Sequence, residues 1–450
     1  MSKWIQERRP KLHFAPQEGW INDPNGLIYD GAQYHLFAQH NPNETVWGPM
    51  HWLHAVSDDL LHWKELGIAL YPNELGTIFS GSAVIDTENT AGFGSGAMIA
   101  MYTQHGERQT QSIAHSQDGM HFTPYEGNPV IENPGIVDFR DPKVFWNAKD
   151  SCWIMALAAR DCIEFYRSKD MRVWEKTGSF GKNEDYYGDV FECPDLFPLR
   201  APDGRVLWVL LVSMAAPAET GGSRMQYYLG EFDGVTFRKL SEQEQAFWVD
   251  TGFDNYAGVT YAGTPERIYF GWAASPTYAG KVPAGNYRGC MTLPRRLDLV
   301  NTDAGVRLAA EPMVQAKKYL PVTDGAKVPV GAFELRLKVD GPFEVRLANR
   351  LGQEFRFGLD GSNCFYADRT RAGASEFDAH YGSALYSVTS TQRLMTGPTE
   401  IRLILDHTLA ELYADKGTYV HSTLVFPTTK YTKIRFTGKV EVQAASLQSR

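Results

Sequence analysis

No stretch of 18 consecutive apolar residues, the minimum for a membrane-spanning helix, occurs in this sequence of 450 residues. The first residues, MSKWIQERRPKLHF, also lack the apolar segment of a secretory signal. No run of Lys or Arg stands out, and the net charge of −9 disfavours nucleic acid and anionic membranes as partners. We therefore expect a cytoplasmic protein that binds neither nucleic acid nor membrane.

Cysteine is scarce: five residues, an odd number, occur without any C-x-x-C motif. This pattern fits reduced thiols better than a disulfide or zinc framework. The nearest approach to a metal pair is His51-x-x-His54, but a strand places residues three apart on opposite faces. The sequence therefore predicts no metal site.

Long segments with helical periodicity are nearly absent, whereas aromatic residues reach 13%. Short apolar runs such as YHLFAQ, AMIAMYTQ and RIYFGWAA are separated by clusters of Gly, Asp, Asn and Pro, which is typical of strands and turns. The chain also exceeds the usual size of a domain with a single core. We expect an all-β protein that is either one large repeat-built domain or two domains.

A weak internal repeat, Ser-x-Asp-x-x-x-aromatic, follows several of these apolar runs. Its aspartates are Asp59, Asp118 and Asp170, with a degenerate copy at Asp233. They are 59, 52 and 63 residues apart (118−59, 170−118, 233−170). Periods of this size with short strands inside each unit indicate a β-propeller with four-stranded blades. At about 60 residues per blade, the region from Trp20 to about residue 310 accommodates about five blades.

The character of the sequence changes after this region. EPMVQAKKYL (311–320) is the best short helix candidate and a natural connector. Beyond it, apolar and charged residues alternate strictly in FELRLKV (333–339), as they do in half-buried antiparallel strands of a β-sandwich. A similar pattern near the end contains Gly438 as an expected kink or turn. We predict a propeller over 1–310, a linker over 311–325 with the boundary near residue 320, and a sandwich over 326–450.

Three carboxylates share one setting, shortly before a proline at the head of an expected strand. Asp23 lies in WINDPNG, Asp141 in DFRDPKVFW and Glu192 in VFECPDLFP, and each stretch alone reads as a turn. Proline biases its predecessor toward extended backbone, so we expect Asp23 and Asp141 to be extended at the head of a strand. Innermost propeller strands all begin at one end of the central channel, so acids at the same blade position converge there. Two carboxylates that flank a glycosidic bond are the usual equipment for its hydrolysis.

These stretches, together with FSGSAV (79–84) and LPRRL (293–297), resemble the β-fructofuranosidase or invertase family, glycoside hydrolase family 32, which includes sucrose-6-phosphate hydrolases. YHLFAQHNP, FDNYAG and LILDHTLAELYADKG extend the resemblance over nearly the whole chain. The resemblance implies an all-β fold, a five-bladed β-propeller followed by a C-terminal β-sandwich. It also implies a retaining glycoside hydrolase that releases terminal β-D-fructofuranosyl units from sucrose, sucrose 6-phosphate or short fructo-oligosaccharides by double displacement.

Carried over motif by motif, the resemblance assigns a role to each acid. Asp23 would be the nucleophile, Glu192 the acid/base, and Asp141 a stabiliser of the transition state that holds fructose hydroxyls. A retaining mechanism requires nucleophile and acid/base about 5 to 5.5 Å apart. Because the carboxylates supply both nucleophile and proton, the chemistry requires no cofactor or metal. The substrate-binding residues implied by the same motifs are Asn22, Gln39, Trp47, Phe79, Ser80, Arg140 and Trp272.

The neighbours of these acids suggest how their charges are controlled. We expect Asn22 to donate a hydrogen bond that keeps Asp23 ionised, and Arg140 to do the same for Asp141. The crowding of anions, Asp195 among them, is expected to favour the protonated form of the acid/base residue, which a general acid needs.

Other functions remain open at this point. A fructosyltransferase or a fructan exo-hydrolase would use the same three acids, and the related arabinanase and xylosidase family ranks low because it lacks the pairing of WINDPNG with ECPDLF. A fructan-binding module without catalysis is disfavoured by the three intact acids. Recognition of a phosphorylated sugar would need basic residues at the rim, for which Lys281, Arg288 and Arg295 are candidates. The sandwich domain is either structural or a homodimer surface, and the sequence does not choose.

Overall fold

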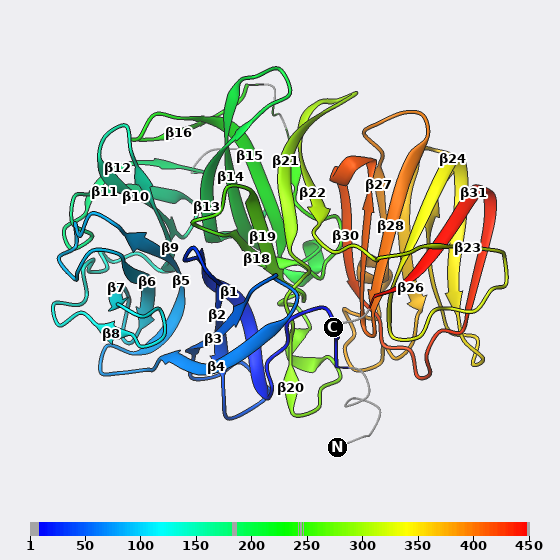
Figure 1. Cartoon of the computed structure of the whole chain (residues 1–450), viewed down its shortest axis with the longest axis horizontal. Helices are drawn as coiled ribbons and strands as arrows, with labels where there is room; N and C mark the ends of the chain where they lie inside the picture. Colours follow the sequence, from blue (N-terminus) through cyan, green and yellow to red (C-terminus); the bar gives the residue numbers. More distant parts are fainter. Residues whose placement is uncertain (1–8, 182–186, 242, 244, 246, 448–450) are drawn as a thin grey trace.

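The computed structural model describes residues 9–181, 187–241, 243, 245 and 247–447 (Figure 1). Five β-sheets form a propeller, and a strand-rich C-terminal sandwich lies beside its last blade (Figure 1). The predicted fold class, all-β with a five-bladed β-propeller followed by a β-sandwich, is confirmed. Within the described residues, no helix combines the length and apolar character needed to cross a membrane.

The blades are antiparallel sheets whose innermost strands surround the central channel. Blades 1 to 3 consist of β1 (Gly19–Tyr29), β2 (Tyr34–Asn41), β3 (His51–Ser57), β4 (Trp63–Leu70); β5 (Thr77–Asp86), β6 (Ala97–His105), β7 (Gln109–Ser116), β8 (Thr123–Pro124); and β9 (Phe139–Asn147), β10 (Cys152–Ala159), β11 (Ile163–Ser168), β12 (Glu175–Phe180). Blades 4 and 5 consist of β13 (Val190–Arg200), β14 (Val206–Ala215), β15 (Arg224–Phe232), β16 (Phe237–Lys239) with β17 (Phe247–Trp248); and β18 (Tyr256–Thr260), β19 (Arg267–Trp272), β21 (Arg295–Thr302), β22 (Gly305–Pro312).

The repeated aspartate signature forms the turn between the third and fourth strands of blades 1 to 4. In blade 1, the Asp59 carboxylate accepts hydrogen bonds from the backbone N–H groups of Leu61 (3.0 Å) and His62 (2.8 Å). An aspartate in this position replaces backbone partners that the turn cannot supply. The signature therefore marks the last turn of a blade.

The ring closes where blade 5 meets blade 1. The short strand β20 (Tyr287–Arg288) pairs in parallel with the start of β1, and the Gly19 N–H donates to the Asn286 carbonyl at 2.8 Å. At the other end of β1, the Ala262 N–H donates to the Leu27 carbonyl at 2.9 Å. These bonds fix the strand that carries Asp23 at both of its ends.

The sandwich is built from two sheets that share two long strands. Its elements are β23 (Leu320–Val322), β24 (Ala332–Ala348), β25 (Glu354–Leu359), β26 (Cys364–Arg371), α2 (Ala384–Ser387), β27 (Val388–Gln392), β28 (Thr399–Asp406), β29 (Leu409–Ala414), β30 (Tyr419–Leu424) and β31 (Lys433–Leu447). The first half of β24 pairs with β28 and the second half with β25, whereas β31 follows β24 along its whole length. The register shifts near Gly438, whose φ of +91° explains why glycine occupies the predicted kink.

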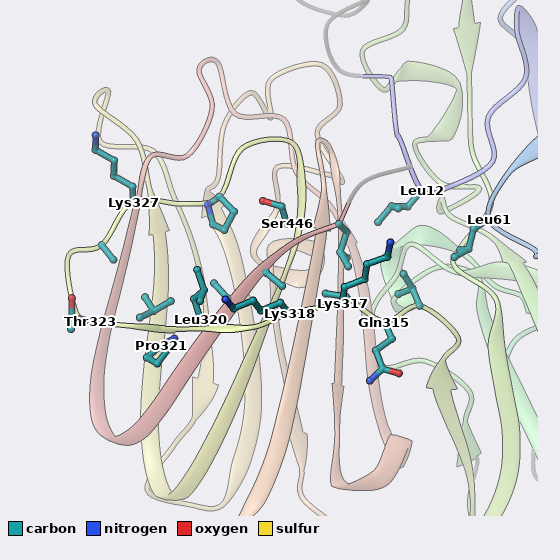
Figure 2. Close-up of a pocket in the computed structure, with 18 of the residues that line it drawn as sticks. Leu12, Leu61, Gln315, Lys317, Lys318, Leu320, Pro321, Thr323, Lys327 and Ser446 are labelled. Atoms are coloured by element: carbon teal, nitrogen blue, oxygen red, sulfur yellow. The ribbon is translucent and has the colours of Figure 1, made fainter. Parts of the chain in front are cut away.

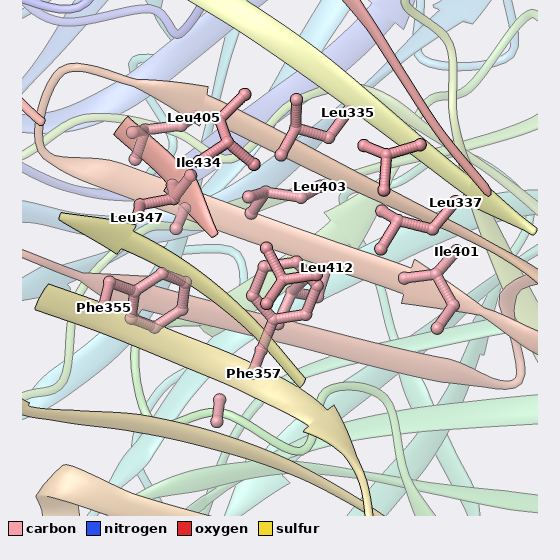
Figure 3. Packing of buried hydrophobic residues seen from close by; sticks show 14 of the residues in the cluster. Leu335, Leu337, Leu347, Phe355, Phe357, Ile401, Leu403, Leu405, Leu412 and Ile434 are labelled. Carbon is pink, nitrogen blue, oxygen red and sulfur yellow. The ribbon is translucent and has the colours of Figure 1, made fainter. Parts of the chain in front are cut away.

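The core of the sandwich contains the predicted apolar face of 333–339. Leu335 and Leu337 are fully buried among side chains of both sheets, including Phe355 and Leu403 (Figure 3). One residue departs from the alternation: Glu334 is also buried, because Tyr319 and Arg402 bind its carboxylate. A sheet face that packs against another domain can hold a charged residue when that residue is paired.

The predicted helix over 311–320 is wrong. The last strand of the propeller continues to Pro312, and the sandwich begins with β23 at Leu320. Between them, Val314 is buried in a cluster formed by both domains. These contacts hold the connector in a path without helix, so tertiary packing overrides a weak local preference for helix.

Candidate active site

A pocket of about 570 Å³ lies at the channel mouth, where the innermost strands begin. All ten predicted site residues line it: Asn22, Asp23, Gln39, Trp47, Phe79, Ser80, Arg140, Asp141, Glu192 and Trp272. This confirms the prediction that residues from distant parts of the sequence meet where the innermost propeller strands begin.

A larger groove of about 910 Å³ runs between the edge of blade 1, the connector and the sandwich (Figure 2). Its lining includes Leu61, Lys317, Lys318 and Leu320 (Figure 2). Among the described residues that line it, Asp59 is the one carboxylate, and it caps a turn. Hydrolysis of a glycosidic bond normally uses two carboxylates, so the smaller pocket is the candidate active site.

A β-bulge at the same level of all five innermost strands creates the site. In each strand two residues oppose one residue of the second strand, and the bulged pairs are Asn22 and Asp23, Phe79 and Ser80, Asp141 and Pro142, Cys193 and Pro194, and Ala257 and Gly258. Bulges re-aim side chains at the ends of strands. The three acids therefore occupy consecutive positions around this bulge rather than one identical position, since Glu192 directly precedes its bulge.

Asp23 lies within β1, so WINDPNG is a bulged strand and not a turn. Its carboxylate accepts hydrogen bonds from Ser80 Oγ (2.6 Å) and from the Asn22 amide (2.9 Å), as predicted for Asn22. The Asn22 amide is oriented in turn by Trp20 Nε1, which donates to its oxygen at 2.7 Å. Burial raises the pKa of Asp23, and the bonds from Ser80 and Asn22 oppose that effect without overcoming it.

Asp141 does not have the extended backbone that its following proline predicted. Its φ of +67° lies in the left-handed region, and Cys193 at the neighbouring bulge has a φ of +44°. Such conformations are uncommon outside glycine and concentrate at functional sites. The turn brings the Asp141 carboxylate to the Cys193 N–H, which donates to it at 2.9 Å. The bulge geometry thus outweighs the local effect of proline.

Glu192 has partners that the sequence did not reveal. Arg140 Nη2 donates to its carboxylate at 2.8 Å and the Tyr256 hydroxyl donates at 2.5 Å. The expected hydrogen bond from Arg140 to Asp141 does not form, because their closest approach is 4.0 Å and Arg140 donates to Asp138 at 2.6 Å. The expected electrostatic effect is present, since the guanidinium opposes the rise in the pKa of Asp141 that burial causes. Arg140, Glu192 and Tyr256 each precede the bulge of their own strand, so the same register places them side by side.

Asp195, expected to crowd the acid/base residue, lies instead in a buried ion pair below the site. Its carboxylate is 3.0 Å from Lys143 Nζ and accepts hydrogen bonds from the backbone and hydroxyl of Thr260. Lys143 also donates to the Thr260 carbonyl at 2.6 Å. This cluster joins blades 3, 4 and 5 beneath the carboxylates.

Replacing Asp195 with alanine is expected to destabilise the fold by about 3 to 5 kcal/mol, because Lys143 would keep a buried charge without its partner. Urea unfolding followed by tryptophan fluorescence measures this loss. The double variant Asp195→Leu/Lys143→Met removes both charges and should recover much of it. An Asp195→Ala variant as stable as the wild type would show that the ion pair of Asp195 with Lys143 does not stabilise the fold.

The pKa of Asp141 predicts a pH-dependent stability. Burial raises this pKa to about 7, with Arg140 opposing the effect. In the unfolded chain the value is about 3.9, so ionising buried Asp141 costs up to about 4 kcal/mol once the pH exceeds 7. The cost is absent below pH 4 and grows as the pH rises toward 7. Asp141→Asn should therefore gain thermal stability relative to the wild type over this interval.

Thermal melts of both proteins at pH 4.5, 6 and 7.5 check this expectation. The Asn side chain has nearly the same shape, so any constant effect of its amide cancels in the pH trend. A difference in Tm that stays flat from pH 4.5 to 7.5 would show that Asp141 ionises without a burial cost.

Several lining groups are suited to sugar hydroxyls and ring carbons. Among the described residues, the buried Gln39 Nε2 and Trp272 Nε1 have no hydrogen-bond acceptor in the protein, although both residues line the pocket. Trp47 is 57% exposed and packs edge-on against Phe79 with ring centroids 5.9 Å apart. Buried donors and an exposed indole supply hydrogen bonds and an apolar face to one ligand.

Sequence reasoning missed several residues of the pocket. Tyr256 occurs in FDNYAG, a stretch that resembles the family but to which no functional role was assigned. Its position before the bulge of the fifth innermost strand was the signal that could have identified it. The others are Trp20, His105, Gln109, Asp138, Pro276, Ala279 and Gly280.

A pocket in which several carboxylates converge at the mouth of a five-bladed propeller defines the class of the protein: it is a glycoside hydrolase. The family model described as the Glycosyl hydrolases family 32 N-terminal domain matches residues 13–312, and the one described as Glycosyl hydrolases family 32 C terminal matches residues 317–449. The chain therefore belongs to glycosyl hydrolase family 32, which confirms the resemblance seen in the sequence.

Characterised relatives share nearly the whole chain. A levanase from Bacillus subtilis is 38% identical over 95% of this chain and 67% of its own length. An extracellular exo-inulinase from Aspergillus awamori is 30% identical over 94% of this chain and 90% of its own length. The structure of a fructofuranosidase from Schwanniomyces occidentalis complexed with fructose superposes with a TM-score of 0.89 at 29% identity and covers both chains completely.

Proposed function

We propose that the enzyme cleaves terminal β-fructofuranosyl linkages with retention of configuration. Asp23 attacks the anomeric carbon, and Glu192 protonates the leaving oxygen and then deprotonates the attacking water. Asp141 binds fructose hydroxyls and stabilises the transition state. The observation that carries the proposal is the convergence of these three carboxylates in one pocket at the channel mouth.

Hydrogen bonds orient two of the three acids in the pocket. Asp23 accepts hydrogen bonds from Ser80 and Asn22, which orient its carboxylate toward the pocket. Glu192 accepts from Tyr256, and burial together with Glu192 raises the pKa of that hydroxyl far above its usual value, so Tyr256 remains a donor at neutral pH. The free donors of Gln39 and Trp272 are suited to hydroxyls of the bound sugar.

The surroundings of the three candidate phosphate-binding residues favour substrates without phosphate. Lys281 pairs with Asp378 at 2.9 Å, and Arg288 donates to backbone carbonyls. Arg295, the third phosphate candidate, is fully buried and binds Asp250 at 2.9 Å, so that prediction is wrong. We therefore propose sucrose and fructo-oligosaccharides as substrates, in keeping with the levanase and inulinase relatives.

Initial rates on sucrose, sucrose 6-phosphate, 1-kestose, inulin and levan, measured side by side, test this function. We expect fructose release from unphosphorylated substrates, with β-fructofuranose as the first product seen by NMR, since double displacement retains the configuration. Transfer of fructose to another sugar in preference to water would favour the fructosyltransferase alternative. Absence of fructose release from every substrate would overturn the proposal.

We also propose a cytoplasmic location, which the five cysteines support because none of them forms a disulfide in the described structure. The Aspergillus relative is named extracellular, so cell fractionation is the decisive measurement. Enzyme recovered from the culture medium would overturn this location. A homodimer surface on the sandwich stays a prediction, which light scattering tests.

A further inference from the structure

A segment of blade 5 forms one side of the pocket mouth. We call residues 273–283, between β19 and β20, the entrance loop. Pro276, Ala279 and Gly280 of this loop line the pocket, and Pro276 and Gly280 are exposed. Asp141, in contrast, is only 5% exposed, so it lies deeper in the pocket than the entrance loop, which lies at the rim. A sugar whose fructosyl unit reaches the acids would place its leaving group against this rim.

The entrance loop is held by the sandwich. Its Tyr278 is buried, and the hydroxyl donates to Asp254 at 2.7 Å while it accepts from Arg369 Nη2 of the sandwich at 3.0 Å. The rings of Tyr381 and Tyr386, also of the sandwich, lie edge-on to Tyr278 with centroids 5.2 and 5.7 Å away. One side chain of the loop is thus enclosed by three side chains of the other domain.

Three further contacts lie next to this enclosure. The Tyr386 hydroxyl donates to the Ala218 carbonyl at 3.0 Å and lies 3.3 Å from Thr277 Oγ1, so it connects blade 4 to the entrance loop. At the other end of the loop, Lys281 Nζ is 2.9 Å from the Asp378 carboxylate. An exposed ion pair contributes little by itself. Here Asp378 is buried and accepts from two backbone N–H groups of its own loop, which fixes its position.

The entrance loop is also connected to blade 1 through Arg288. Arg288 donates to the Gly280 carbonyl and, at 2.9 Å, to the Thr45 carbonyl. Thr45 is two residues before Trp47, the exposed indole at the rim. The loop that carries Trp47 and the entrance loop are therefore joined by one guanidinium, and both line the pocket mouth.

We propose that Asp378 and Tyr386 of the sandwich are positioning residues that set the affinity of the active site for the leaving group. They hold the entrance loop, and through Arg288 the Trp47 loop, where the part of the substrate beyond the fructosyl unit contacts the protein. The inference rests on the proposed function and gives the sandwich a share in substrate choice. It leaves the groups that touch the fructosyl unit unchanged, because neither residue lines the pocket.

Asp378→Asn and Tyr386→Phe, alone and combined, test the proposal, with Lys281→Met as a variant on the other side of the ion pair. Kinetics are compared on 1-kestose, which has a large leaving group, and on methyl β-D-fructofuranoside, which has almost none. We expect the KM for 1-kestose to rise about five- to tenfold in the combined variant, with kcat within about twofold, because the rim must be ordered on binding. The methyl glycoside should keep its wild-type kinetics.

Lys439→Met is the matched control, because Lys439 forms an exposed pair with Asp340 elsewhere in the sandwich. Hydrogen exchange of the peptide 273–283 should be faster in the combined variant and unchanged in the control. An equal loss on both substrates would overturn the inference in favour of a purely structural role, as would unchanged kinetics on 1-kestose. A wild-type protein that releases no fructose from either substrate would overturn the proposed function instead, and the inference with it.

Discussion

Asp23→Asn is expected to lower kcat for fructose release from sucrose by on the order of 10⁵-fold, because the amide cannot form the bond to the anomeric carbon. The pocket itself should survive, since Asn has the shape of Asp and its side-chain oxygen can still accept the hydrogen bond from Ser80. Burial raises the pKa of Asp23, so removing its charge should maintain or increase the thermal stability. Initial rates and thermal melts of the purified variant measure both effects.

The matched control is Asp118→Asn, which makes the same change in an exposed turn of blade 2, where Asp118 accepts from the N–H groups of Met120 and His121. It should keep wild-type activity. Mass spectrometry of wild-type enzyme quenched during turnover should find a fructosyl adduct on the peptide that contains Asp23. An Asp23→Asn variant with more than about 1% of wild-type kcat would place the nucleophile elsewhere.

Glu192→Gln is expected to lower kcat/KM on sucrose by about 10³-fold, because glutamine cannot protonate the leaving glucose. The loss should depend on the leaving group. The phenolate of an aryl β-fructofuranoside leaves with little protonation, so the first step of the reaction should be far less affected on that substrate. The second step then lacks a general base, and the fructosyl enzyme should accumulate. Azide, which attacks without a base, should restore turnover and yield fructosyl azide.

Glu231→Gln provides the control, because the Glu231 side chain is 70% exposed on blade 4. It should match the wild type on both substrates. Stopped-flow measurements with the aryl substrate separate the two steps of the Glu192→Gln variant. Equal losses on sucrose and the aryl substrate, without rescue by azide, would show that Glu192 only supports the pocket through Arg140 and Tyr256.

Much of the fold was readable because the propeller repeats a local device. Each aspartate of the signature, such as Asp59, caps a turn with bonds to the next few residues, and such bonds depend only on nearby sequence. The alternating pattern of 333–339 was equally local. The connector over 311–320 was misread for the opposite reason, since contacts from two domains decide its path.

The membership of the pocket was predicted well, whereas its internal pairing was not. Asp23 and its partner Asn22 are adjacent in sequence, so their hydrogen bond could be foreseen. Arg140 also has an acidic neighbour, Asp141, yet it bonds to Glu192 of the next blade. Adjacent residues of a bulged strand point in different directions, and the register between strands cannot be read from one strand alone.

By itself, the sequence determined the all-β architecture and the repeat and indicated the three candidate acids, because turn chemistry, alternation and short motifs are local properties. Only the tertiary structure decided that Asp141 has a left-handed backbone and that Asp195 forms a buried ion pair with Lys143. It also decided that the sandwich contacts and holds the entrance loop. Each of these features depends either on the register at which the five innermost strands form their bulges or on the contact between the two domains. Contacts between segments that are far apart in sequence arise only once the ring of blades has closed.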